Sequence, residues 1–265
     1  MTFRLTAFPL LLIAVTAPLR VPIASAQTPS ARIDSTPERR LRLIFITCSV
    51  EGKFFLPVRK GMEDAAARMG VQSEFTGTEG VDFPAQAAMV RRAVAEGYDG
   101  IALNLVHPTA FDEVVTEAIE QGVPVVAFNT DDAATPNDRL SAVSQRLYEA
   151  GKALARHVLP DIPRARHVLL TMHDKGISSL EDRLRGEQEI LKTKGIQWTT
   201  VITGDDAQQG MEVVAEALRA NPDIRIVLGT GQSDTQAAGM AIERHFANCG
   251  YWSAGFDLSP ETLRL

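Results

Sequence analysis

The chain carries one pattern of apolar strands and amphipathic helices twice along its length. Residues 124 positions apart coincide in type: Leu43 to Thr47 (LIFIT) matches His167 to Thr171 (HVLLT), and Asp82 matches Asp206. Strands that alternate with helices over short connections are typical of a parallel sheet with helices on both faces. The repeat therefore predicts an α/β fold of two similar doubly wound parallel-sheet lobes, with coincidence of generic α/β patterning as the alternative.

The expected elements follow from the spacing of apolar residues in each segment. Strands are expected at Leu41–Thr47, Val71–Thr76, Gly100–Leu105, Val123–Phe128, His167–Met172, Gln197–Thr203, Ile224–Gly229 and Tyr251–Phe256. Helices are expected at Phe54–Met69, Asp82–Glu96, Thr109–Gln121, Leu147–Leu159, Ser179–Lys194, Ala207–Ala220 and Ser233–Phe246.

The first strand and the loop after it indicate where a ligand would bind. A uniformly apolar strand belongs in a parallel sheet covered on both faces, and ligands of such sheets bind outside the carboxyl ends of the strands. The loops at those ends supply aromatic faces, an imidazole, amide and carboxylate acceptors and guanidinium donors, which suit a polyhydroxylated ligand. The candidate ligand-binding residues are Phe54, Phe55, His107, Asn129, Arg183, Asp234 and Asp257.

Several of these candidates also have a structural interpretation. One of Phe54 and Phe55 would suit the core, and Asp257 would suit a cap of the helix that begins near Ser259. Arg183 and Asp234 are expected to face one another at the edge of the second lobe and to share one ligand. Without a ligand they would pair directly, and a permanent structural ion pair is the alternative.

The ends of the chain and its charge restrict the class of protein. Residues 1–26 have an early Arg4, a short apolar run and the triplet Ala24-Ser25-Ala26, so a secretory signal peptide cleaved after Ala26 is predicted; residues 27–40 read as a linker. That leader holds two of the 27 basic residues and none of the 33 acidic ones, which leaves 25 against 33 and a net charge of −8. An acidic exported protein is a poor candidate for binding nucleic acid.

Cys48 and Cys249 fall in different halves of the pattern, at positions expected to be in strands. A disulfide requires Cα atoms within about 7 Å of each other, so the two are not expected to be bonded.

No sequence motif indicates catalysis, a metal or a cofactor. The chain has no G-x-S-x-G elbow, no P-loop and no Cys or His pairs at metal spacing, and the segment at Gly229 and Gly231 lacks the third glycine of a dinucleotide loop. The neighbours His173 and Asp174 are a weak catalytic pair, because adjacent loop residues seldom face each other. We therefore expect no enzyme, no metal and no cofactor.

From residue 41 to 265 the chain resembles the periplasmic sugar-binding proteins of ABC importers, the ribose- and galactose-binding-like group with the type I periplasmic binding protein fold. The resemblance lies in Phe54-Phe55, Lys60-Gly61, Gly97-Tyr98-Asp99-Gly100-Ile101, the segment from Gly122 to Asn129, Asp182 to Gly186, Gln232-Ser233-Asp234 and Gly255-Phe256-Asp257. It implies that Phe54 and Phe55 sandwich the sugar, that Arg183 binds ring-proximal oxygens and that Asp234 accepts two hydroxyls. It places Asn129 and Asp257 at crossovers between the lobes.

The chain departs from the family pattern in two loops. His107 stands where many members carry a hydroxyl-binding Asp, and Glu51-Gly52-Lys53 replaces the usual Asn-Pro-rich lead-in. The resemblance also implies further elements beyond Leu265, so a truncated product or fragment is expected. The expected boundaries are a first lobe at 41–129, a second lobe at 130–256 and the start of a return segment at 257–265.

The resemblance implies hinged capture of a sugar or polyol between the lobes and delivery to an ABC permease in the inner membrane. Hinges are expected at 129–132 and 257–259. The alternatives are a soluble sensor that feeds a chemoreceptor or sensor kinase, and the effector-binding domain of a LacI-like regulator. No helix-turn-helix precedes Leu41, and the leader favours export.

Overall fold

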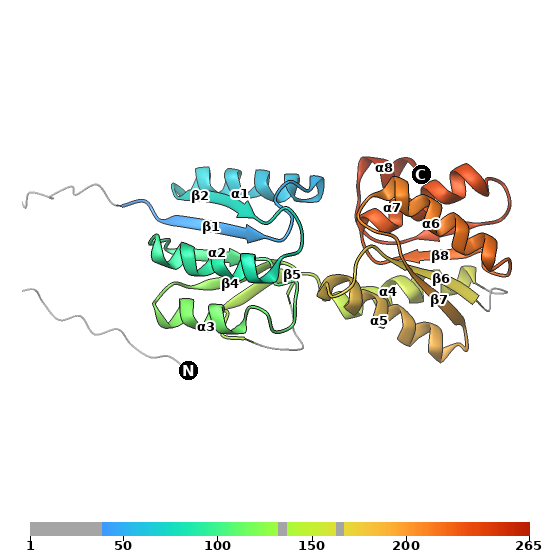
Figure 1. The fold of residues 1–265 in the computed structure, drawn as a ribbon, viewed down its shortest axis with the longest axis horizontal. Coiled ribbons are helices and arrows are strands. Elements are labelled where there is room, and N and C mark those ends of the chain that lie inside the picture. The colour runs from blue at the N-terminus through green and yellow to red at the C-terminus, as the bar shows by residue number, and fades with distance from the viewer. Residues whose placement is uncertain (1–38, 132–136, 163–166) are drawn as a thin grey trace, which may run out of the picture. The chain divides into compact units, whose positions relative to one another are not determined.

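A computed structural model describes residues 39–131, 137–162 and 167–265 (Figure 1). The predicted signal peptide and most of the predicted linker lie outside the described residues. Within the described ranges, no helix is both long and apolar enough to cross a membrane.

The first lobe is built on a sheet of five parallel strands in the order β2-β1-β3-β4-β5. Figure 1 shows α1 on one face of this sheet, with α2 and α3 on the other. The elements are β1 (Arg42–Thr47), η1 (Lys53–Phe55), α1 (Leu56–Met69), β2 (Gln72–Gly77), α2 (Phe83–Ala95), β3 (Gly100–Leu103), α3 (Asp112–Glu120), β4 (Val125–Asn129) and β5 (Ser141–Ser144).

The central strands of the first sheet bury alternate side chains on opposite faces, as strand geometry requires. On the α2 and α3 face, Ile44 and Ile46 pack with Val90 and Val114. On the α1 face, Ala102 packs with aromatic side chains, among them Phe55 and Phe128. Both faces are therefore sealed by apolar packing, and the polar loops gather at the strand ends.

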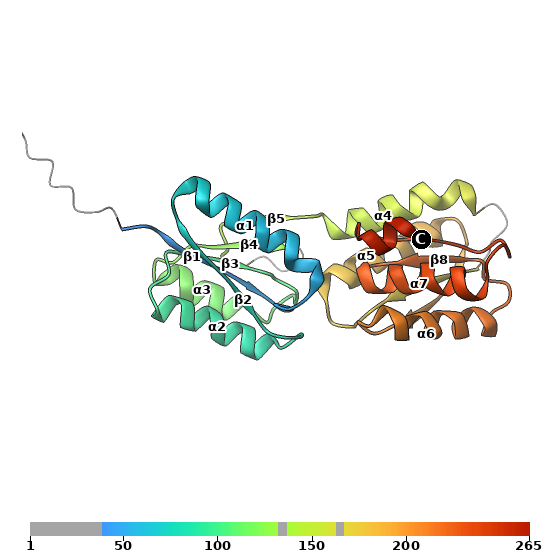
Figure 2. The ribbon, with the colours of Figure 1, turned by 90° about the horizontal axis from the view of Figure 1, so that it is seen from above.

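The second lobe is built on a sheet of four parallel strands in the order β7-β6-β8-β9. Figure 2 shows α4 and α5 on one face and α6 and α7 on the other. The elements are α4 (Leu147–Val158), η2 (Leu159–Asp161), β6 (His167–Met172), α5 (Ser178–Thr193), β7 (Gln197–Ile202), α6 (Ala207–Ala220), β8 (Ile226–Gly229), α7 (Gln232–His245), β9 (Trp252–Ala254) and α8 (Pro260–Arg264).

The two lobes repeat the same capping chemistry at the predicted offset. The Asp82 side chain accepts from the amide of Ala85 at the start of α2, at 2.9 Å. The Asp206 side chain accepts from the amides of Gln208 and Gln209 at the start of α6, at 2.7 and 3.3 Å. Each carboxylate satisfies helix-terminal N–H groups that have no partner within the helix. The predicted doubly wound α/β fold with two similar lobes is confirmed.

One strand was missed, and it moves a lobe boundary. β5 pairs with β4 in the first sheet. Residues 141–144 therefore belong to the first lobe, and their expected place in a second lobe that starts at residue 130 is wrong. Its sequence, SAVS, is exposed throughout and has no buried apolar face. A strand held only by backbone pairing at a sheet edge gives no periodic apolar signal.

Candidate functional site

The Arg183 guanidinium occupies the centre of a polar cluster in the second lobe, in the first turns of α5. Its Nη1 donates to the carbonyl oxygen of Thr230 at 2.8 Å, and its Nε and Nη2 donate to Oε1 of Gln145 at 3.2 and 2.9 Å. Its Cζ lies 4.2 Å from the centroid of the Phe256 ring, and Nη1 is 4.0 Å from Oδ2 of Asp257. These contacts hold the planar group in one orientation beside an aromatic face and a carboxylate.

A close approach of two helices fixes the position of Arg183. Gly151 of α4 lies against the backbone of Arg183, and Gly186 of α5 lies against the carbonyl oxygen of Tyr148. A side chain at either glycine would collide with backbone atoms of the other helix. The small residues therefore let α4 and α5 pack tightly enough to fix the start of α5.

Asp234, in the first turn of α7, is completely buried with each of its oxygens engaged. Its Oδ2 accepts from the amide of Thr230 at 2.6 Å and from the hydroxyl of Thr171 at 3.0 Å. Its Oδ1 is 3.2 Å from Nδ1 of His173. A buried carboxylate is stable only with such partners.

The expected direct ion pair between Arg183 and Asp234 is wrong. Arg183 pairs with Asp257, and the two oxygens of Asp234 are held by Thr171, Thr230 and His173. Burial lowers the pKa of Arg183, and the charges of nearby carboxylates, Asp257 first, oppose that effect. Burial also raises the pKa of Asp257, and the Arg183 charge opposes it. That Arg183 and Asp234 share one ligand stays a prediction.

His173 is the site residue that sequence reasoning missed. The sequence pairs it by adjacency with Asp174, whereas the fold pairs it with Asp234, 61 residues later. A histidine directly after an apolar strand was the available signal, since the carboxyl ends of parallel strands form the binding edge.

The two adjacent phenylalanines of the first lobe have different environments. Phe55 is 5% exposed and packs among Phe75, Phe128 and other apolar side chains, with ring centroids 6.0 and 6.3 Å away. Phe54 is 38% exposed and meets Phe55 edge to face at 5.0 Å. Phe55 is therefore a core residue, as the structural alternative held, and Phe54 is the one whose ring is available at the surface.

His107 follows β3 and holds one tautomer. Its Nδ1 accepts from the backbone amides of Thr109 and Ala110 at 3.2 and 3.1 Å. Its ring lies 4.7 Å from the ring of Phe83, between centroids. A nitrogen that accepts two N–H groups carries no proton, so the imidazole proton is on Nε2, which is a donor. His107 therefore offers a donor where an Asp would offer an acceptor.

Asn129 closes β4 with a left-handed backbone at φ 63°. Its Nδ2 donates to Oγ1 of Thr130 at 3.3 Å and to Oδ1 of the buried Asn104 at 3.5 Å. Asn104 in turn donates to Oγ1 of Thr47 at the end of β1, at 3.3 Å. This chain of amides ties together the carboxyl ends of three neighbouring strands.

The sequence from residue 43 to residue 265 matches the model of the family described as the periplasmic binding protein domain. This chain belongs to the periplasmic binding protein family.

The similar proteins are remote in sequence but close in fold. The xylose/arabinose-binding protein XylF of Sulfolobus acidocaldarius is 25% identical over 84% of this chain and 58% of its own length. The crystal structure of a periplasmic sugar-binding protein of an ABC sugar transporter from Legionella pneumophila matches 85% of this chain and 84% of that one, with 25% identity and a TM-score of 0.78. That of a carbohydrate transporter from Acidothermus cellulolyticus, in complex with myo-inositol, matches 82% and 74%, with 28% identity and a TM-score of 0.73.

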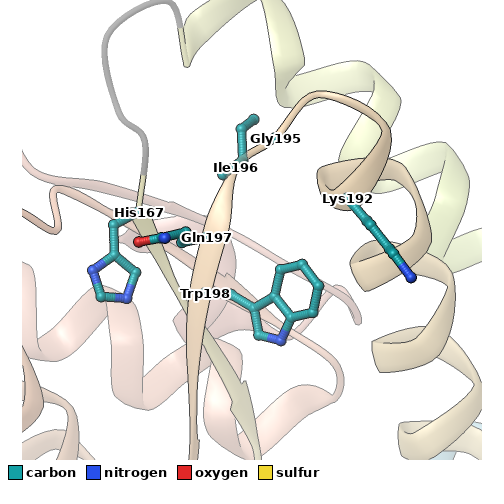
Figure 3. Close-up of a pocket in the computed structure, with 6 residues that line it drawn as sticks. All are labelled: His167, Lys192, Gly195, Ile196, Gln197 and Trp198. Carbon is teal, nitrogen blue, oxygen red and sulfur yellow. The ribbon is translucent and has the colours of Figure 1, made fainter.

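A pocket of about 450 Å³ lies away from the strand ends that carry the candidate residues of this periplasmic binding protein (Figure 3). It lies at the amino ends of β6 and β7 and is lined by His167, Lys192, Gln197 and Trp198 among others. The His167 ring is held at Nδ1 by Asp223 and at Nε2 by Thr199, both at 2.9 Å. The pocket is therefore separate from the polar cluster around Arg183.

Within its described residues, this periplasmic binding protein has no group of three His, Cys, Asp or Glu side chains placed to hold a metal ion. The fold brings Arg183, Asp234 and Asp257 together with His173 at one edge of the second sheet. The first lobe contributes Phe54 from η1, His107 from the loop after β3 and Asn129 from the end of β4.

Proposed function

We propose that this chain is the solute-binding component of an ABC transporter, which captures a sugar or related polyol and delivers it to a membrane permease. The family assignment and the functions of the relatives support this proposal. The chain spans 58% of the length of the Sulfolobus XylF protein. A sugar ligand and a permease partner are therefore proposed for this chain by similarity to its relatives.

The observation that carries the proposal is the arrangement of Arg183, Phe256 and Asp257. The guanidinium presents charged donors in a fixed fork, the carboxylate of Asp257 accepts, and the Phe256 ring supplies an apolar face. Each hydroxyl of a sugar can both donate and accept a hydrogen bond, and the C–H groups of its ring form apolar faces, so this set of groups matches a sugar.

In the proposed mechanism, the first lobe adds Phe54, the Nε2 donor of His107 and the amide of Asn129 to the same ligand. A ligand that touches both lobes favours the closed arrangement by its additional contacts in that state, and no bond is made or broken. The protein would need no cofactor and would act after export, with the segment 1–26 removed as a signal peptide. A permease would recognise the closed, loaded form.

A calorimetric and thermal-shift screen of D-xylose, L-arabinose, D-allose and myo-inositol tests this proposal. At least one should raise the melting temperature, and the rise should grow with the logarithm of the ligand concentration above the dissociation constant, as binding to the folded state requires. Arg183→Lys should raise the dissociation constant of that ligand by about tenfold or more, because Lys keeps the charge and loses the planar fork.

Arg185→Lys is the matched control. Arg185 lies in the same helix, is largely exposed and pairs with Asp182 at 2.9 Å, so its replacement should leave the affinity unchanged. If the Arg183 variant loses unliganded stability but keeps its affinity, Arg183 is structural and the proposed site is wrong. If none of the compounds stabilises the protein, the proposed ligand class is wrong.

A further inference from the structure

His173 lies between two carboxylates at the end of β6. Its Nδ1 is 3.2 Å from Oδ1 of the buried Asp234, and its Nε2 is 3.7 Å from Oδ1 of the exposed Asp205. The ring also covers Gly231, where an added Cβ would come within 2.9 Å of two ring atoms. The glycine in the β8–α7 loop thus leaves room for the imidazole against the first turn of α7.

We propose that His173 is a positioning residue for ligand binding, whose imidazolium holds the Asp234 carboxylate in place, so that ligand affinity falls when His173 loses its proton. The inference rests on the proposed function, because Asp234 and Arg183 are taken as parts of the sugar site. It adds a residue and a pH dependence that the family resemblance does not supply.

The charged groups that act on His173 are carboxylates from four segments of the second lobe. Asp174 is the next residue in the chain, Asp205 precedes α6, and Asp234 opens α7; Asp257, which follows β9, interacts with His173 electrostatically as well. Arg183 carries the positive charge that, besides that of His173, acts on both Asp234 and Asp257. Protonated His173 therefore offsets part of the negative charge of these carboxylates, which Arg183 alone would otherwise have to offset.

The pKa of His173 supports the protonated form. Burial alone lowers this pKa, but the hydrogen bond and the charge of Asp234, with the charges of Asp205 and Asp174, raise it overall above the ordinary value. The protonated state of His173 is thus favoured in the folded protein over the unfolded chain.

When His173 loses its proton, the negative charge that Arg183 has to offset increases. With His173 neutral, Asp234 and Asp257 share one guanidinium. The repulsion between the imidazolium and the guanidinium is also lost, so the net attraction of Arg183 toward the buried Asp234 increases. A guanidinium drawn inward is less available to the oxygens of a ligand. A ligand that binds Arg183 therefore favours protonated His173, and by linkage protonated His173 favours the ligand.

The test combines two measurements on the whole chain. Ring 15N NMR of the ligand-free protein should give a titration midpoint for His173 above the ordinary imidazole value of about 6.5, and Asp234→Asn should lower that midpoint. Asp205→Asn should lower it less, and this exposed residue provides the comparison if the buried Asp234 variant fails to fold. Calorimetry from pH 5.5 to 8.5 with L-arabinose, D-xylose, D-allose and myo-inositol should show, for a compound that binds, a dissociation constant that rises by about three- to tenfold through that midpoint.

Two replacements of His173 separate its charge from its hydrogen bond. His173→Gln keeps an N–H donor without a titrating group, so its affinity should be independent of pH and close to the high-pH value of the wild type. His173→Leu removes the donor and should weaken binding at every pH. His157→Gln, in α4, should leave the wild-type profile unchanged.

The outcomes distinguish this proposal from the one it rests on. A His173 midpoint at or below about 6.5, unaffected by both Asp variants, overturns the role of His173 whatever the sugars do. A pH-dependent affinity retained in His173→Gln overturns it as well. Failure of all four compounds to bind at any pH overturns the proposed function, and the dependence of affinity on His173 with it.

Discussion

Asn129 and Asp257 both hold a left-handed backbone, at φ 63° and φ 70°, after corresponding strands of the two lobes. Non-glycine residues adopt this conformation uncommonly, and Asn and Asp are the side chains that tolerate it best. Each residue stands where the chain leaves its sheet. We therefore expect the backbone conformation at Asn129 and Asp257 to fix the direction in which the chain enters each expected hinge segment.

The backbone at Asn129 gives the first prediction. Asn129→Ala should unfold with a free energy about 1 kcal/mol lower than that of Asn129→Gly, because both lose the amide but only Ala is strained in the left-handed region. Urea denaturation at fixed pH measures the difference. Asn248, at φ 61° in a turn, is the control and should show a similar gap between its Ala and Gly variants. A more stable Ala variant at Asn129 would contradict the prediction.

The phenylalanine pair gives the second prediction. Phe55→Ala should lower the free energy of unfolding by about 3 to 5 kcal/mol, because it empties a buried aromatic cluster. Phe54→Ala should cost less than about 1 kcal/mol and should weaken sugar binding instead. Chemical denaturation and calorimetry on the two single variants separate the roles. Equal losses of stability would place both rings in the core.

Glu187 gives the third prediction. The residue is completely buried one turn after Arg183, and neither of its carboxyl oxygens has a hydrogen-bond partner. Burial raises its pKa well above the ordinary value of 4.5, the charge of Asp234 adds to the shift, and the charge of Arg183 opposes it. Protonated Glu187 therefore contributes fully to the free energy of unfolding below about pH 4.5, the ordinary pKa of the unfolded chain. This contribution is lost as the pH rises toward the raised pKa of the folded protein.

Glu187→Gln should therefore become more stable relative to the wild type as the pH increases from 5 to 8. Denaturation midpoints of the two proteins at several pH values measure this. Glu189→Gln, in the same helix and partly exposed, is the control and should show no such trend. A constant difference between Glu187→Gln and the wild type would mean that Glu187 is ionised in the folded protein.

The cysteines give the fourth prediction. Both are free, as expected from the sequence; Cys48 is buried and Cys249 is exposed. Burial raises the pKa of the Cys48 thiol to about 11, and the thiolate is the reactive form. With an aromatic disulfide reagent at pH 8, one thiol should react quickly in the native protein and the second only after denaturation. Cys249→Ser should remove the fast reaction; a fast reaction that persists would show that Cys48 is accessible.

The sequence by itself determined the repeated backbone pattern. The bounds of β6 and α6 agree with the predicted ones to the residue, and the helix caps at Asp82 and Asp206 repeat at the predicted offset of 124 residues. These features depend on local apolar spacing and on helix-terminal N–H groups, which act over a few residues. β5 was invisible to the same reasoning, because an exposed edge strand has no apolar face.

Only the tertiary structure decided which side chains meet. Phe54 and Phe55 are neighbours of one type, yet packing against Phe75 and Phe128 buries one and leaves the other exposed. Arg183 was expected beside Asp234 but pairs with Asp257, and His173 holds Asp234 across 61 residues. Such pairings depend on strand order, helix docking and the space left by glycines, which no local pattern encodes.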